Sequence, residues 1–155
     1  MINLRCMGMA TLALVMSASA SAGAWGEGPF DNDDAQDWLI ECSRSEGASA
    51  IAAAIDAALR PGYLEADAGS VAVAAAEVIA STGEKRPATT SADVQQCLAK
   101  ARMPEVRALA PRARQAMTRV SDVSSSELAQ LWSASKSTRW AAGISQLATR
   151  LDRPR

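Results

Sequence analysis

The chain has 155 residues, of which 48% are apolar, but 34 residues are alanine, so the bulky side chains that fill a core are fewer than the apolar share suggests. Histidine is absent, which excludes a Ser-His-Asp or Cys-His catalytic arrangement and any imidazole metal ligand. The length is that of one domain, and the apolar content is too high for a disordered chain. We therefore expect one folded domain without a cofactor.

Residues 1–22 have the three-part layout of a secretory signal peptide. A basic start is followed by 11 apolar residues at 6–16 and then by small residues up to Ala22. Such a run is too short to cross a membrane, which takes about 20 residues. Cleavage is expected after Ala20 or Ala22 and leaves 23–155 as a single exported domain, periplasmic or secreted, without a later membrane span.

Export affects the expectation for the cysteines, because Cys6 would leave with the signal and only Cys42 and Cys97 would remain. An even pair in an oxidising compartment usually forms a disulfide. Two buried free thiols are the alternative. A metal site is disfavoured, since a site without histidine normally needs four thiolates. We therefore predict a Cys42–Cys97 disulfide and assign no metal ligand.

The two halves of the expected mature chain carry opposite charge. Residues 23–84 contain 12 acidic and two basic residues, a net charge of −10, whereas residues 85–155 contain 13 basic and five acidic residues, a net charge of +8. We favour mutual neutralisation within one domain; the alternative is a basic face displayed to an anionic partner. Nucleic acid is not an expected partner, because the basic half lacks interleaved aromatic residues.

Apolar residues recur at helical spacing along most of the chain, and no stretch alternates with the two-residue period of a strand. The first helix is expected to begin at a cap formed by Asp31 or Asn32 and to run to about Ser45. Further helices are predicted near 49–59, 67–82 (capped by Asp67), 91–102, 104–120 (restarted or kinked at Pro111), 126–132 (opened by a capping box at Ser124–Glu127) and 137–151. The sequence predicts an all-α bundle of about six to seven helices, preceded by an irregular Gly/Trp-rich segment.

The irregular segment begins Gly-Ala-Trp-Gly-Glu-Gly-Pro-Phe-Asp-Asn-Asp and resembles the opening of a bacterial family called domain of unknown function 4259. Members of that family start with Trp-Gly-x-Gly-x-Phe-x-Asn-Asp. The matching residues here are Trp25, Gly26, Gly28, Phe30, Asn32, Asp33 and Trp38. Further similarity at 63–67, 74–78, 126–132 and 140–151 covers nearly the whole expected mature chain. The resemblance implies no activity, since the family has none established.

An acidic group surrounds the start of the first helix. Its members are Asp31, Asp33, Asp34, Asp37 and Glu41. Three of them share one helix side and could hold a hard cation together with water. A calcium-binding loop is not matched, however, because Gln36 occupies the position of that loop's glycine. Capping and a solvated helix face account for the same residues.

Glu77 lies in the most apolar of the predicted helices. Burial would raise its pKa and suit it to acid/base catalysis. Glycoside hydrolysis would also need a second carboxylate across a cleft, which Glu65 or Asp67 could supply. Pairing with a base of the second half, such as Arg112 or Arg114, is the interpretation we favour. No catalytic residue is assigned.

The aromatic residues around the glycines form either a lid over the bundle or a recognition surface, where tryptophan is enriched. The candidate binding residues are Trp25, Phe30, Asn32, Asp33, Asp34 and Trp38. We expect a non-catalytic protein that binds another protein, as inhibitors and immunity proteins do. The rival functions are a carboxylate- or metal-dependent hydrolase using Asp33, Asp34, Asp37 or Glu77, and a structural component of the cell envelope.

Overall fold

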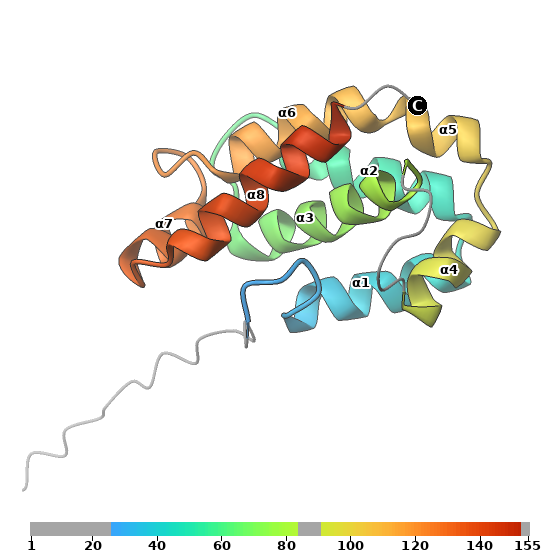
Figure 1. The fold of residues 1–155 in the computed structure, drawn as a ribbon, viewed down its shortest axis with the longest axis horizontal. Helices are drawn as coiled ribbons and strands as arrows, with labels where there is room; N and C mark the ends of the chain where they lie inside the picture. Colours follow the sequence, from blue (N-terminus) through green and yellow to red (C-terminus); the bar gives the residue numbers. More distant parts are fainter. Residues whose placement is uncertain (1–25, 84–90, 153–155) are drawn as a thin grey trace, which may run out of the picture.

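The computed structural model describes residues 26–83 and 91–152, which form helices and no strand (Figure 1). The helices within these residues are α1 (Asp33–Arg44), α2 (Gly47–Leu59), α3 (Ala66–Ser81), α4 (Ala92–Ala99), α5 (Met103–Ala108), α6 (Ala110–Val120), α7 (Glu127–Ala134) and α8 (Thr138–Leu151). The all-α prediction is confirmed. The structure has one helix more than predicted, because the predicted helix at 104–120 is divided into α5 and α6. Pro111 lies in the first turn of α6, where proline is tolerated because an amide proton would have no partner within the helix. None of the described helices is long and apolar enough to cross a membrane.

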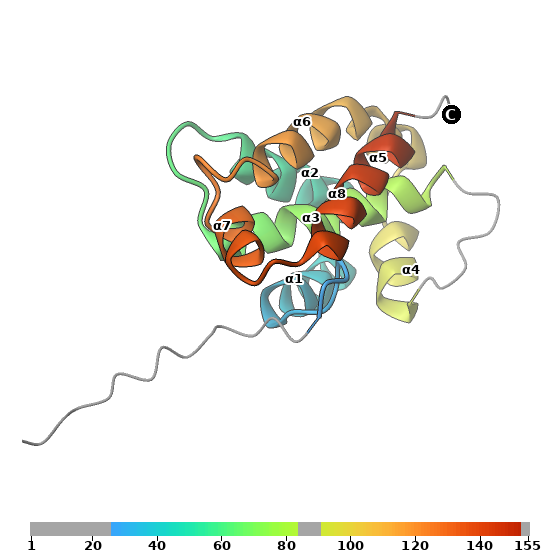
Figure 2. The ribbon, with the colours of Figure 1, turned by 60° about the vertical axis from the view of Figure 1, so that its left-hand side comes forward.

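The central helix is α3, which passes between α1 on one side and α6 and α8 on the other (Figures 1 and 2). Ten of its 16 residues are buried, among them the run Ala72–Ala76. Small side chains let neighbouring backbones come close. Alanine-rich sequence in this helix therefore allows contact with α1, α2, α6, α7 and α8 at once.

Three predicted helix starts are confirmed by their caps. Asn32 accepts a hydrogen bond from the amide of Ala35 at 2.8 Å. Ser91 and Ser137 accept from the amides three residues further on, each at 3.3 Å. Each cap satisfies an amide that has no partner inside the helix.

The start of α3 is capped from another helix. The carboxylate of Glu127 in α7 accepts from the amide of Ala66 at 2.8 Å. Asp67, predicted as the cap, lies in the first turn instead, and the cap position belongs to Glu65. The predicted capping box is also wrong, since Ser126 rather than Ser124 caps α7, which places Glu127 at the first helical position.

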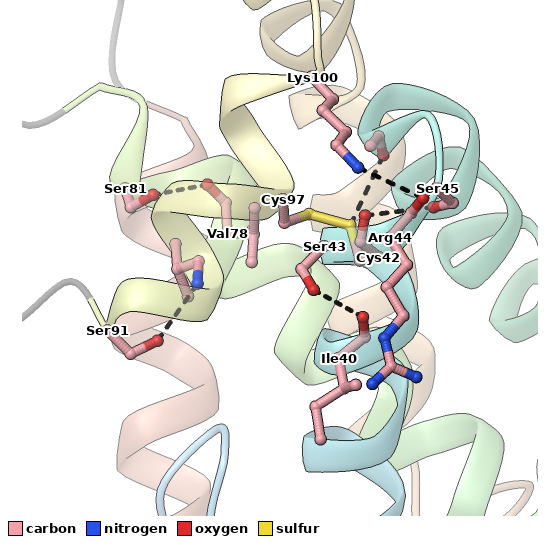
Figure 3. The surroundings of a disulfide bond; sticks show 12 residues. Ile40, Cys42, Ser43, Arg44, Ser45, Val78, Ser81, Ser91, Cys97 and Lys100 are labelled. Carbon is pink, nitrogen blue, oxygen red and sulfur yellow. Dashed lines mark hydrogen bonds between the residues drawn. A yellow bond between two sulfur atoms is a disulfide. The ribbon is translucent and has the colours of Figure 1, made fainter.

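The predicted disulfide joins Cys42 of α1 to Cys97 of α4, with 5.1 Å between the Cα atoms (Figure 3). Both residues are completely buried. Beside the bond, Lys100 Nζ donates to the carbonyl of Arg44 at 3.4 Å. Gly47 permits this approach of α4, because a Cβ atom at that position would overlap the carbonyl oxygen of Cys97.

The acidic and basic halves are joined by ion pairs. Arg150 of α8 binds both carboxylate oxygens of Glu77 at 2.8 Å. Pairing of Glu77 was predicted correctly, but with the wrong arginine: Arg112 pairs with Asp56 and Arg114 with Asp152. Arg150, in the last turn of α8, reaches α3 because these two helices pack together.

Candidate binding site at the start of the first helix

The N-terminal segment, residues 26–32, is folded around the side chain of Asp31. One carboxylate oxygen of Asp31 accepts from the amide of Gly28 at 2.9 Å, and its backbone carbonyl accepts from Gly26 at 3.3 Å. A Cβ atom at either glycine would overlap this carboxylate. The two glycines are therefore required by a close approach of side chain and backbone.

The same segment is tied to the start of α8. The carboxylate of Glu27 accepts from the hydroxyl of Ser137 and, at 2.9 Å, from Nε of Arg139. Phe30 packs against the core, and its carbonyl accepts from the side-chain amide (Nε2) of Gln36 at 2.8 Å. These contacts support the interpretation of the segment as a lid over one end of the bundle, near the blue start of α1 in Figure 1.

A small hollow of ≈ 20 Å³ lies beneath the segment. It is lined by Gly26, Gly28, Pro29, Asn32, Ser70, Val73, Leu128, Trp132 and Trp140. The rings of Trp132 and Trp140 are stacked, with centroids 6.1 Å apart and planes 16° from parallel. The hollow thus brings together the N-terminal segment, α3, α7 and α8.

Next to the hollow, carboxylates from two helices lie close together, and we call Asp33, Asp34, Asp37 and Asp67 the acidic face. Asp33 and Asp37 are exposed, and Asp34 is half-buried. The pKa of Asp34 is raised by its partial burial and then by the negative charges of Asp67, Asp33 and Asp37. The positive end of the α1 dipole favours only the two carboxylates in the first turn.

The acidic face is not neutralised from within the described part of the chain. The ion pairs found there involve other carboxylates. Over residues 26–83 and 91–152, no three Cys, Asp or Glu side chains are grouped so that they could hold a metal ion. The arrangement is consequently a negatively charged surface, with no metal-binding geometry in the described residues.

The structure gives the predicted binding residues different tasks. Asn32 caps α1, and Phe30 and Trp38 pack against the core. Asp33 and Asp34 remain displayed at the surface, while Trp25 lies outside the described residues. Sequence reasoning did not place Asp67, Ser70, Trp132 or Trp140 in this site, because nothing in their spacing indicates that α3, α7 and α8 meet the N-terminal segment.

These features define a small, disulfide-linked helical domain whose glycine-rich opening is folded around an aspartate. The family model "Domain of unknown function (DUF4259)" matches residues 23–143. The chain belongs to this family. No curated protein and no solved structure matches it.

Proposed function

We propose that this is an exported, non-catalytic protein that binds a basic surface of another protein through the acidic face. The observation that carries the proposal is a group of four carboxylates that no described residue pairs with a base, whereas five other carboxylates of the described residues form ion pairs. Like charges held together reduce the stability of a fold. A positively charged partner would remove that repulsion on binding and would be attracted to this face before contact.

Export is supported by two independent features. The first 22 residues have the composition of a signal peptide, and a buried disulfide such as Cys42–Cys97 is typical of proteins in an oxidising compartment. Cleavage after Ala20 or Ala22 and residence in the periplasm or outside the cell are part of the proposal. The mass of the protein purified from the native envelope fraction tests the cleavage site.

Inhibition or neutralisation of the partner, as immunity proteins achieve, is the mode of action that suits a small acidic binder. No specific observation favours the rival functions. Glu77, the partly buried candidate for acid/base catalysis, is held by two hydrogen bonds from Arg150. An envelope component assembling through its acidic and basic halves would need both displayed, whereas Arg112 and Arg150 of the basic half already pair with Asp56 and Glu77 of the acidic half.

The test is affinity capture from the native envelope fraction, with residues 23–155 carrying a C-terminal tag, at low and at high salt. The variant Asp34→Asn/Asp37→Asn should lose a stoichiometric partner that the unmodified domain retains at low salt. The matched control Glu46→Gln/Asp93→Asn removes the same number of charges elsewhere and should retain it. Each exposed charge contributes about 0.2–1 kcal/mol, so the partner should bind the first variant roughly 2- to 30-fold more weakly.

Equal retention by both variants, at both salt concentrations, would show that the acidic face is not the binding surface. Capture of nothing but the domain itself from a fraction in which it is naturally abundant would reject a protein partner. The disulfide must be intact in each preparation, which a thiol titration under denaturing conditions establishes.

A further inference from the structure

The large apolar side chains that remain exposed are concentrated at one end of the bundle. Among the described residues they are Ile40, Tyr63, Val123 and Leu131. All except Ile40 lie in α7 or in the two loops that precede α3 and α7 (Figure 2). We call Tyr63, Val123 and Leu131 the apolar patch. Single exposed apolar residues are common on protein surfaces, whereas a contiguous group with a polar rim marks an interaction site.

The two loops that carry Tyr63 and Val123 are fixed to each other through their backbones. The amide of Leu64 donates to the carbonyl of Ser125 at 2.9 Å, and the amide of Glu127 donates to the carbonyl of Leu64 at 2.9 Å. Successive side chains of an extended segment point to opposite sides. Leu64 is buried at 3% exposure, so its neighbour Tyr63 points outwards and is 50% exposed.

One side chain of α7 connects the members of the apolar patch. The hydroxyl of Tyr63 donates to Oε1 of Gln130 at 2.8 Å, and Nε2 of Gln130 donates to the carbonyl of Val123 at 2.9 Å. Leu131 follows Gln130 and lies one turn beyond Glu127 on the same side of α7. The patch is therefore ordered in the free protein, which reduces the entropy that binding would cost.

Carboxylates border the apolar patch. The pKa of Tyr63 is raised by desolvation and then by the negative charges of Glu127 and Glu65, so both carboxylates lie near its ring. Neither forms an ion pair within the described part of the chain. Arg119, a base beside the same loop, donates to the carbonyl of Gly62 instead. The rim next to Tyr63 is consequently negative.

The apolar patch adjoins the acidic face. Asp67 follows Glu65 by two residues and lies in the first turn of α3, and its charge acts on Asp34 of α1. The two surfaces therefore meet where α3 begins. An apolar centre with a charged rim is the common build of a protein–protein interface.

We propose that the apolar patch anchors the partner protein, and that the partner presents to it an apolar side chain flanked by lysine or arginine. The apolar side chain packs against Tyr63 and Leu131, and the flanking bases meet Glu65 and Glu127. This inference rests on the proposed function and adds to it the apolar part of the interface. A second copy of this chain does not fit, because a symmetric dimer brings identical surfaces together and would place these carboxylates against each other.

The direct probe is the terminally blocked peptide Lys-Lys-Leu-Phe-Leu-Lys-Lys, titrated into residues 23–155 at pH 7 and constant low ionic strength. Binding is followed by methyl resonances in proton–carbon NMR spectra. Those of Val123 and Leu131 should shift and saturate, whereas those of Ile40, outside the patch, should stay in place. The matched peptide Glu-Glu-Leu-Phe-Leu-Glu-Glu has the same apolar centre and should bind at least about tenfold more weakly, because its charges are repelled by the rim.

Variants of the patch test its part in binding the captured partner. Leu131→Ser and Tyr63→Ser should each weaken that binding about fivefold or more, as expected for side chains at the centre of an interface. Tyr63→Phe keeps the ring and should retain most of the binding. Ile40→Ser removes an exposed apolar side chain elsewhere and is the matched control, which should bind normally. Because Leu131 is 55% exposed, Leu131→Ser should leave the melting temperature unchanged.

The outcomes separate the apolar patch from the proposed function. Normal partner binding by Leu131→Ser and Tyr63→Ser, or equal weakening by Ile40→Ser, overturns the patch and leaves the acidic face as the binding surface. Equal binding of the two peptides, or no binding of the basic one, overturns the flanking bases. Self-association in sedimentation that Leu131→Ser abolishes assigns the patch to a second copy and overturns the inference. Failure of the unmodified domain to capture any partner overturns the proposed function, whatever the peptides do.

Discussion

The disulfide should contribute more to stability than any other single feature of the domain. The bond closes a loop of 55 residues, and the chain-entropy relation gives about 4 kcal/mol for a loop of this length. The helix α4 has only eight residues, of which Val94 and Cys97 are buried. Its attachment to α1 therefore depends strongly on this bond. We expect the variant Cys42→Ala/Cys97→Ala to lose about 4 kcal/mol of the free energy of unfolding.

Urea unfolding followed by circular dichroism measures this loss. With a slope of about 1–3 kcal/mol per molar urea, the midpoint should fall by roughly 1.3–4 M. Hydrogen exchange should show the amides of α4 losing protection before those of α3, because α4 is the smaller and more peripheral helix. A loss below about 1 kcal/mol, or equal loss of protection in both helices, would refute the reasoning from loop closure and local attachment.

Three further changes are predicted from the contacts. Gly47→Ala should destabilise the domain by about 1–3 kcal/mol in urea unfolding, since the new methyl group meets the backbone of α4; an unchanged midpoint would contradict this. Glu77→Gln should cost about 2 kcal/mol in the same measurement, because the Arg150 guanidinium, which is only 25% exposed, loses its charged partner. Asp34→Asn should raise stability at neutral pH. Burial and then the neighbouring carboxylates raise the pKa of Asp34 above 3.8 in the fold, so its carboxylate is destabilising above that raised pKa. The gain should therefore disappear as the pH falls towards 3.8, and thermal unfolding at several pH values that showed the same gain throughout would contradict the raised pKa.

Features that depend on neighbouring residues were predictable from the sequence. The caps at Asn32, Ser91 and Ser137 each bond to an amide three residues further along, so residue type and the following apolar pattern indicate them. The pattern left Asp31 open beside Asn32, and it missed the caps of α3 and α7 by two residues. The disulfide followed from counting cysteines in a chain with a signal-like start. Neither prediction required knowledge of the tertiary arrangement.

Features that depend on how helices meet were not predictable. The carboxylate of Glu127 caps a helix that begins 61 residues earlier in the chain, and Arg150 was one of several arginines that could reach Glu77. The acidic face likewise needs Asp67 of α3 next to Asp34 of α1. Spacing along the chain carries no information about such pairs, because helix packing decides which residues meet.

The division between local and long-range features also bears on what the family signature means. Gly26 and Gly28 are required because the backbone wraps around Asp31, and Asn32 is required because it caps α1. Each of these signature residues has a structural task that it completes within the signature itself. A match to the signature therefore identifies the fold of the opening segment. We therefore expect recognition of a partner to depend on the carboxylates of the acidic face, of which Asp34, Asp37 and Asp67 lie beyond the signature.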